Sequence, residues 1–301
     1  MNIVVFGSGA IGSLFGALLA KHNTVVLVGR TPHIASIQQK GLIINGKTRL
    51  TRTVPAVEST KEISLAPDLI LLTVKSYDTE SASRQLRPLL HGQTMVVSLQ
   101  NGLDNVQKIE QDIEKKHILA GVTTHGALIL KPGVVIHTGK GKTILGELDG
   151  HYSERLKTLV TVFNQAGIET QMSTDIGREI WGKAIINSSI NPLTGFLGCK
   201  NGYLLHNPLL EKTVESVCKE SSLIASSYGI RISPVDMIEK TKAVIRDTAQ
   251  NYSSMLQSIQ QGKKTEIDSI NGVLLRIGSE HKVDTSLNRI LFELITSLRP
   301  T

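Results

Sequence analysis

The stretch IVVFGSGAIG, residues 3–12, decides the fold of this chain. Its first four residues are an apolar run that predicts a buried strand, and glycines follow at positions 7, 9 and 12. The next residues, 11–21, have the composition of a helix. A strand, a glycine-rich turn and a helix in this order are typical of the first unit of a parallel α/β fold.

The glycine motif predicts a bound dinucleotide. In such a turn the first glycine permits the tight bend, and the second lets the backbone approach a pyrophosphate. The third allows close packing of helix on strand, while the helix N-terminus faces the anion. A glycine-rich packing turn without a ligand is the alternative. The residues predicted to contact the cofactor here are Gly7, Ser8, Gly9, Ala10, Ile11 and Gly12.

The end of the second expected strand, residues 24–28, indicates which dinucleotide binds. NAD-binding proteins usually place an acidic residue there for the ribose 2′-hydroxyl, but this chain has Arg30. A guanidinium suits a 2′-phosphate through charge-assisted hydrogen bonds. Lys75, at the tip of a later strand, is expected near the same region. We therefore predict NADP (NADPH) as the cofactor, with a solvated surface arginine as the alternative.

Strands that alternate with helices predict a Rossmann-type, doubly wound α/β domain over residues 1–172. A hairpin with its tight turn at Asn45 and Gly46 is expected over residues 42–48. Short strands at 127–130, 134–137 and 143–145 predict an antiparallel extension of the sheet edge. The other expected elements are strands at 69–74, 95–99, 118–122 and 168–172, and a helix at 152–166.

From residue 173 onward only helical spacing remains, which predicts an all-α C-terminal domain over residues 173–301 that supplies the catalytic and substrate-binding groups. Because proline disfavours a helical residue before it, Pro192 is expected to end or bend the first helix around Asn191. The expected helices are residues 175–189, 208–228, 234–249 and 266–281.

Composition narrows the class of protein. Of the 301 residues, 40% are hydrophobic and 20% charged, which is typical of a globular chain. Cys199 and Cys218 have no metal-ligand spacing, so neither a disulfide framework nor a metal site is expected. The apolar stretch 3–20 has no basic segment before it and is interrupted by glycines, so we predict a cytoplasmic protein without membrane association.

The net charge of +7 is spread along the chain without interleaved aromatic residues, which argues against nucleic acid as a partner. The same charge suits an anionic cofactor and a small acidic substrate. The oligomeric state is left open, with a homodimer as one assembly to consider.

Reducing a ketone requires a proton donor near the carbonyl oxygen, and a partly desolvated lysine meets this need. Lys183, Asn187 and Asn191 recur at intervals of four, which places them on one face of an otherwise apolar helix. Ser254 and Glu266, further along the chain, are polar candidates to bind substrate or orient the lysine. Buried amides with satisfied hydrogen bonds, or ordinary helix ends, are the structural alternatives.

Several motifs occur together in one order along nearly the whole chain. With them the chain resembles the ketopantoate reductase (2-dehydropantoate 2-reductase) family. The motifs are GSGAIG at 7–12, Arg30, LLTVKSYD at 71–78, QNG at 100–102, TTHGA at 123–127, WGKAIINSSINPLTG at 181–195, NYSSMLQ at 251–257 and TEIDSING at 265–272.

The resemblance implies NADPH-dependent reduction of 2-dehydropantoate to (R)-pantoate, a step toward coenzyme A. It implies that Lys183 donates the proton, that Glu266 organises the site, and that Arg30 and Lys75 select the 2′-phosphate. Asn101 is implied to position nicotinamide and substrate. The predicted contact residues are completed by Ala127 and Glu266 for the cofactor, and by Asn101, Lys183, Asn187, Asn191, Asn201 and Ser254 for the substrate.

One position departs from the family pattern, because Ser258 stands where many relatives have an acidic residue. Two other functions stay open on the residues alone: an NADP-dependent reductase of a different small 2-keto acid, and a non-catalytic NADP(H)-binding sensor. A sensor has no need of a lysine aligned with two asparagines.

Overall fold

The structure is a computed structural model, and it describes residues 1–298. The chain forms two compact units. The first, here called the α/β unit, comprises residues 1–100 and 105–176; the second, the helical unit, comprises residues 101–104 and the chain from residue 177 onward. Among residues 1–298, no helix has the length and apolar character needed to cross a membrane.

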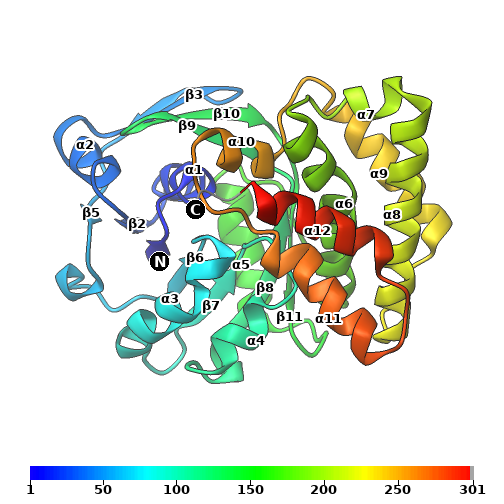
Figure 1. Cartoon of the computed structure of the whole chain (residues 1–301). Coiled ribbons are helices and arrows are strands. Elements are labelled where there is room, and N and C mark those ends of the chain that lie inside the picture. Colours follow the sequence, from blue (N-terminus) through cyan, green and yellow to red (C-terminus); the bar gives the residue numbers. More distant parts are fainter. Residues whose placement is uncertain (299–301) are drawn as a thin grey trace. The chain divides into compact units, whose positions relative to one another are not determined.

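The α/β unit is built on an eight-stranded sheet (Figure 1). Its strands, in spatial order, are β12 (Thr170–Met172), β11 (Thr143–Glu147), β8 (Ile118–Thr123), β7 (Met95–Ser98), β6 (Leu69–Leu72), β1 (Asn2–Phe6), β2 (Thr24–Val28) and β5 (Ala56–Val57). The strands from β8 to β5 are all parallel. Since the chain winds outward in both directions from β1 and β6, the predicted Rossmann-type, doubly wound sheet is confirmed.

Both faces of this sheet are buried because successive residues of its strands point to opposite sides. In β1, Ile3 and Val5 belong to one hydrophobic cluster, and Val4 and Phe6 belong to another. The first cluster includes side chains of α1 (Ala10–Leu19), α2 (His33–Lys40) and α5 (Glu154–Gln165). The second includes side chains of α3 (Thr79–Leu86) and α4 (Asn105–Glu110). Short 3-10 turns in the connections are η1 (Thr60–Glu62), η2 (Ser76–Asp78), η3 (Arg87–Leu89) and η4 (Lys115–His117).

A second, four-stranded sheet covers the side of the main sheet on which α1 lies. The prediction that the strands near residues 127–130 and 134–137 extend the main sheet was wrong, because both belong to this second sheet. The strands are β4 (Leu50–Arg52), β3 (Leu42–Gly46), β10 (Val134–Gly139) and β9 (Gly126–Lys131), in this spatial order. Only β11 extends the main sheet in antiparallel fashion, whereas β9 and β10 join the hairpin of β3 and β4. The reason is burial: β10 pairs in parallel with β3, which brings Val135 beside Ile44, and both are fully buried in the α1-side cluster.

The hairpin itself is confirmed, but not its predicted tight turn. Ile44 is the last residue of β3 that pairs with β4, and its partner is Leu50, so the hairpin lacks a two-residue turn at Asn45 and Gly46. Of the two expected turn residues, only Gly46 has a positive φ, 93°.

The helical unit contains no strand among its described residues. Its helices are α6 (Ile176–Leu197), α7 (Tyr203–His206), α8 (Pro208–Ser227), α9 (Pro234–Asp247), α10 (Ser254–Gln260), α11 (Val273–Glu280) and α12 (Ser286–Ser297), with a π-helical turn, η5 (Asp268–Gly272), before α11. The predicted all-α architecture is confirmed (Figure 1).

The helix end that was one expected effect of Pro192 does not occur, because α6 continues past it to Leu197. A proline has no N–H for the carbonyl of the residue four positions earlier, here Ser188. The amide of Asn271 in η5 donates to that carbonyl at 3.4 Å, and the same amide group donates to Asn288 Oδ1 in α12 at 2.9 Å. A side chain from another element thus fills the gap that the proline leaves.

The carboxylate of Glu220 in α8 holds the start of α12. It accepts hydrogen bonds from the backbone N–H groups of Leu287 and Asn288 at 3.0 and 2.9 Å, and from Asn288 Nδ2 at 2.7 Å. A carboxylate at a helix N-terminus satisfies donors that have no partner within the helix. Glu220, Asn288 and Asn271 together therefore link α8, α12, η5 and α6.

Candidate functional site

The glycine loop after β1 has two glycines that pack and one that faces open space. Gly7 has a φ of 104°, and a Cβ there would lie 2.5 Å from the backbone nitrogen of Val74. A Cβ on Gly12 would lie 2.2 Å from the carbonyl oxygen of Gly7 and 2.5 Å from Thr73 Oγ1. A Cβ on Gly9, in contrast, would have no atom within 4 Å. The loop is therefore bare at the position where a phosphate group has to approach the backbone.

The N-terminus of α1 is prepared for an anion. Its N-cap is Gly9, no side chain caps the helix, and its first turn contains no acidic residue. Ala10 and Ile11 begin this turn and carry no competing polar group. The first N–H groups of a helix have no partner inside it and attract negative charge. These features fit the pyrophosphate of a dinucleotide.

A series of hydrogen bonds through the buried side chains of Ser13 and His33 holds the backbone of the glycine loop in place. Ser13 Oγ donates to the carbonyl of Ser8 at 3.0 Å, and His33 Nε2 lies 3.0 Å from Ser13 Oγ. The backbone N–H of Gly133 donates to His33 Nδ1 at 3.1 Å, which assigns the ring proton to Nε2. Burial lowers the pKa of His33, consistent with this neutral form. Sequence reasoning missed His33, because nothing local relates it to the glycine loop.

Arg30 and Lys75 lie at the C-terminal ends of the two strands that flank β1. Arg30 follows β2, its side chain is 83% exposed, and its Nη2 donates to Asp78 Oδ2 at 2.9 Å. Lys75 follows β6 and directly precedes η2, which contains Asp78. Both predicted selectors therefore belong to the strand ends that surround the glycine loop. Ala127 lies in β9, which packs on α1, and is partly buried against the α1-side cluster.

In the helical unit, Lys183 is partly buried on α6 among the buried residues Trp181, Ala184 and Ile185. Burial lowers the pKa of Lys183 to about 8, although the carboxylate of Glu266 opposes this shift by favouring the charged ammonium. The predicted companions follow along the helix: Asn187 is partly buried and Asn191 is buried. A lysine with a pKa near neutrality can both hold and release a proton at physiological pH.

Glu266 is buried, and the loop of residues 101–104 lies against it. Asn101 Nδ2 donates to Glu266 Oε2 at 3.3 Å, and the backbone N–H of Leu103 donates to the carbonyl of Ser269 at 2.9 Å. The loop follows β7 in the sequence, yet it groups with the helical unit. The structure therefore brings Asn101, Glu266 and Lys183 into one unit, although Asn101 precedes the other two by more than 80 residues and only the family resemblance implied a role for it.

Asn201 connects the segment after α6 to the segment before α10. Its backbone N–H donates to the carbonyl of Asn251 at 3.0 Å, and its Nδ2 donates to Thr248 Oγ1 at 2.9 Å. The Oδ1 atom is buried and has no hydrogen-bond partner within residues 1–298. A buried acceptor of this kind is costly unless a ligand or water supplies a donor.

Ser254 is the first residue of α10 and is exposed, whereas the preceding Ser253 caps this helix and accepts a hydrogen bond from Thr194 Oγ1 of α6 at 2.8 Å. Ser258, the departure from the family pattern, is buried and donates to the carbonyl of Ser254 at 3.0 Å. Its hydroxyl is thus used inside α10.

The candidate residues fall into two groups, one in each unit. The α/β unit holds the glycine loop, Arg30, Lys75 and Ala127; the helical unit holds Lys183, Glu266, Asn101, Asn187, Asn191, Asn201 and Ser254. Within residues 1–298, no three His, Cys, Asp or Glu side chains gather in a way that could hold a metal ion.

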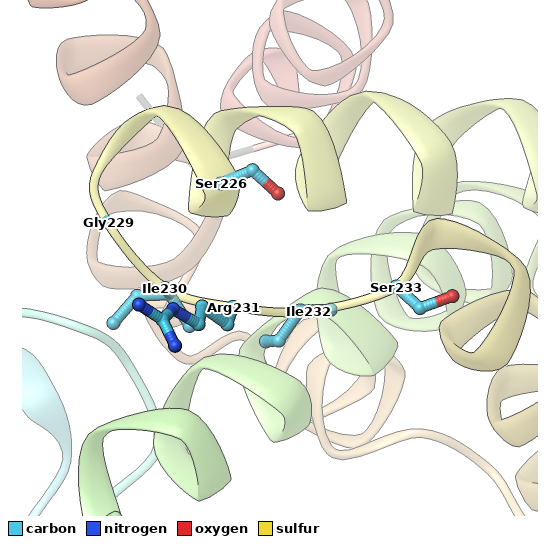
Figure 2. Close-up of a pocket in the computed structure, with 6 residues that line it drawn as sticks. All are labelled: Ser226, Gly229, Ile230, Arg231, Ile232 and Ser233. Carbon is cyan, nitrogen blue, oxygen red and sulfur yellow. The ribbon is translucent and has the colours of Figure 1, made fainter.

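An open pocket of about 680 Å³ lies at the connection from α8 to α9, and Figure 2 shows the residues that line it. None of the candidate residues lines it, and Arg231 is its one charged lining residue. The lining residues are Ser226, Gly229, Ile230, Arg231, Ile232 and Ser233. This pocket lacks the paired proton donor and carboxylate that distinguish the Lys183 region.

Comparison with known proteins covers almost the entire chain. The sequence profile of the family Ketopantoate reductase PanE/ApbA matches residues 3–150, and the profile Ketopantoate reductase PanE/ApbA C terminal matches residues 175–299. The chain is 40% identical to the 2-dehydropantoate 2-reductase of Pyrococcus abyssi over 298 residues, 98% of this chain and 97% of that protein.

Two solved structures have the same fold over nearly their full length. A PanE/ApbA family ketopantoate reductase from Ralstonia eutropha JMP134 superposes with a TM-score of 0.91 at 27% identity, covering 99% of this chain and 98% of that chain. A D-mandelate dehydrogenase with NADH and anilino(oxo)acetate superposes with a TM-score of 0.94 at 28% identity, with the same coverage.

Proposed function

Because the chain belongs to the ketopantoate reductase (PanE/ApbA) family, we propose that it reduces 2-dehydropantoate to (R)-pantoate with NADPH. The observation that carries this function is Lys183, a lysine on an apolar helix whose pKa burial lowers to about 8, while the Glu266 carboxylate favours its charged form. An ammonium group of this kind is the proton donor that a forming alkoxide requires.

The α/β unit has the features that NADPH needs. The bare backbone at Gly9 and the uncapped α1 N-terminus fit the pyrophosphate, and Arg30 and Lys75 supply positive charge for a 2′-phosphate. Ser8, Ala10, Ile11 and Ala127 are the remaining residues that we assign to the cofactor in this unit. When bound, NADPH supplies the hydride that reduction of the keto carbon requires.

Lys183, Glu266 and Asn101 have distinct roles in this proposal. The Lys183 ammonium donates a hydrogen bond to the keto oxygen, which polarises the carbonyl, and then transfers its proton to that oxygen. Glu266 stabilises the ammonium before transfer, because its carboxylate raises the pKa of Lys183. Asn101 holds the Glu266 carboxylate through the 3.3 Å hydrogen bond from Nδ2.

The remaining polar groups of the helical unit suit the hydroxyl and carboxylate ends of the substrate. Asn187 and Asn191 follow Lys183 along α6 and offer amide donors and acceptors. The buried Oδ1 of Asn201 requires a donor, which a substrate hydroxyl would supply. Ser254 completes the substrate-binding set that we propose. In this proposal residues 1–172 bind the cofactor and residues 173–301 bind the substrate. Asn101 is the exception, because it lies within residues 1–172 and contacts the substrate.

We place the reaction in the cytoplasm, which suits a chain whose two cysteines, Cys199 and Cys218, are unpaired. A small molecule is the only partner this function requires.

The proposal is tested by monitoring NADPH oxidation through the decrease in NADPH absorbance. Ketopantoate should be reduced with a higher kcat/KM than pyruvate, 2-ketoisovalerate or benzoylformate. A marked preference for one of the other acids would identify a reductase of a different substrate. Binding of NADPH without oxidation in the presence of any of these acids would indicate a sensor and refute the enzymatic function.

The pH dependence of the reaction follows from the pKa of Lys183. Reduction needs the protonated ammonium, so kcat is expected to fall as the pH rises through about 8. The reverse reaction, oxidation of pantoate, needs the neutral amine and should accelerate over the same range. Initial rates in both directions between pH 6 and pH 10 would measure this, and parallel profiles in the two directions would contradict the proton-donor role.

Glu266→Gln should shift the midpoint of this pH profile to a lower pH. The substitution removes the carboxylate that favours the charged ammonium, so the apparent pKa of Lys183 should fall below about 8. The measurement is the pH at half-maximal kcat for the variant and the unaltered protein. An unchanged or higher midpoint would show that Glu266 does not act on Lys183 electrostatically.

A further inference from the structure

We propose that the cofactor site accepts NADH as well as NADPH, and that Asp78 is the specificity-determining residue that binds the unphosphorylated ribose. This inference rests on the proposed cofactor site at the glycine loop. It concerns the carboxylate that ends the motif at residues 71–78 and that had no predicted role, because the residue is distant in the sequence from the second strand, where acidic residues that bind the ribose usually occur.

The position of Asp78 follows from strand order. β2 and β6 both pair with β1, so the segments that leave their C-terminal ends lie on either side of the glycine loop. Arg30 leaves β2 and Asp78 ends η2, the turn that follows β6. Their side chains meet, with Arg30 Nη2 2.9 Å from Asp78 Oδ2. The Asp78 carboxylate thus comes from the strand on the other side of β1 and lies against the guanidinium of the arginine that follows β2.

The charges around Arg30 do not form a purely cationic site. Arg30 and Lys75 are positive, but Asp78 is bonded to Arg30, and the Glu58 carboxylate accepts a hydrogen bond from the hydroxyl of Thr31, the residue next to Arg30. Two carboxylates therefore accompany the two cations. A dianionic 2′-phosphate meets both attraction and repulsion here, whereas a neutral 2′-hydroxyl meets an acceptor without any charge conflict.

Each cofactor would bind a different residue of the Arg30–Asp78 pair. With NADH, the 2′-hydroxyl donates to the Asp78 carboxylate, as in NAD-binding proteins with an acidic residue after the second strand. With NADPH, the guanidinium turns toward the 2′-phosphate. The side chains of Arg30 and Asp78 are 83% and 32% exposed, so their ion pair is weak and is broken at little cost.

Binding of adenosine fragments, measured by calorimetry on the full chain, tests the proposal without catalysis. The probes are 5′-AMP, which has a free 2′-hydroxyl, and adenosine 2′,5′-bisphosphate, which carries the 2′-phosphate. Asp78→Asn should weaken 5′-AMP and strengthen the bisphosphate, which raises the ratio of the two affinities by roughly tenfold, the scale of one hydrogen bond to a charged group. Glu80→Gln, an exposed carboxylate two residues away, removes the same charge and should leave the ratio unchanged.

Steady-state kinetics should show the same change in cofactor preference as the affinities of the two fragments. The unaltered protein should reduce ketopantoate with NADH, and Asp78→Asn should raise KM for NADH while leaving kcat unchanged. An unchanged affinity ratio in Asp78→Asn, or a greater loss for the bisphosphate than for 5′-AMP, would overturn the proposal, since Asp78 would then only orient Arg30 for the phosphate. Circular dichroism verifies that the variant is folded. Failure of the proposed function is a separate result, absence of ketopantoate-dependent NADPH oxidation.

Discussion

Lys183→Ala is expected to lower kcat for ketopantoate reduction by roughly 10²–10⁴-fold, the range for loss of a general acid. In the proposed mechanism the ammonium group is the proton source for the forming alkoxide and also polarises the carbonyl before hydride transfer. The affinity for NADPH should change little, because the glycine loop and Arg30 belong to the other unit of the chain. Stopped-flow turnover and NADPH fluorescence titration would measure the two effects separately.

Two further lysine variants sharpen this prediction. Lys183→Met keeps the aliphatic stem and removes only the charge, so it should lose nearly as much activity as the alanine variant. Lys219→Ala removes an exposed lysine of α8 and should retain full activity. Turnover by Lys183→Ala within a few-fold of the unaltered protein would rule out Lys183 as the proton donor.

Gly9→Ala and Gly12→Ala should both weaken NADPH binding, but for different reasons. A methyl group on Gly9 meets no protein atom and stands where the pyrophosphate approaches the backbone. It should therefore weaken NADPH by roughly 10–100-fold, the value of one charge-assisted hydrogen bond, with almost no change in Tm. A methyl group on Gly12 would lie 2.2 Å from the carbonyl oxygen of Gly7, so the helix has to shift. The resulting overpacking should destabilise the fold by about 1–3 kcal/mol in addition.

Thermal unfolding with and without NADPH separates these two effects. Gly9→Ala should unfold at the original Tm without cofactor and lose the upward shift that the cofactor gives, since a ligand that binds only the folded state raises Tm. Gly12→Ala should show a lower Tm under both conditions. If Gly9→Ala bound NADPH normally, the assignment of this loop to the pyrophosphate would be wrong.

Local patterns in the sequence predicted much of the fold. The apolar strand, the three glycines and the following helix are contiguous, so their structure depends mainly on neighbours in the chain. The helical spacing after residue 173 predicted helices whose bounds agree closely with α8 and α9, because a repeating apolar face requires burial wherever the helix packs. The proline pattern allowed a helix end at Asn191 that does not occur, because the compensating donor, Asn271, comes from a distant element.

Long-range pairing set the limit of prediction. The second sheet forms because β3 pairs with β10, which is distant in the sequence, and the sequence of neither strand indicates which strand it pairs with. For the site, spacing aligned Lys183 with Asn187 and Asn191 and offered Glu266 as one of the polar candidates to orient the lysine, but only the family resemblance singled out Glu266 as the residue that organises the site. Glu220 follows Val217 by three residues, so the sequence places this carboxylate on the same helix face as an apolar residue, and both are buried in α8.

The loop at 101–104 limits how this enzyme can be recombined. Its hydrogen bonds to Glu266 and Ser269 mean that the helical half, grafted from a relative by a single junction near residue 176, would inherit a foreign loop. Functional exchange of substrate-binding halves between family members would then require two grafts at once, the C-terminal segment and a four-residue piece from within the N-terminal one. Selection on substrate choice should accordingly leave correlated changes in two separate parts of the gene.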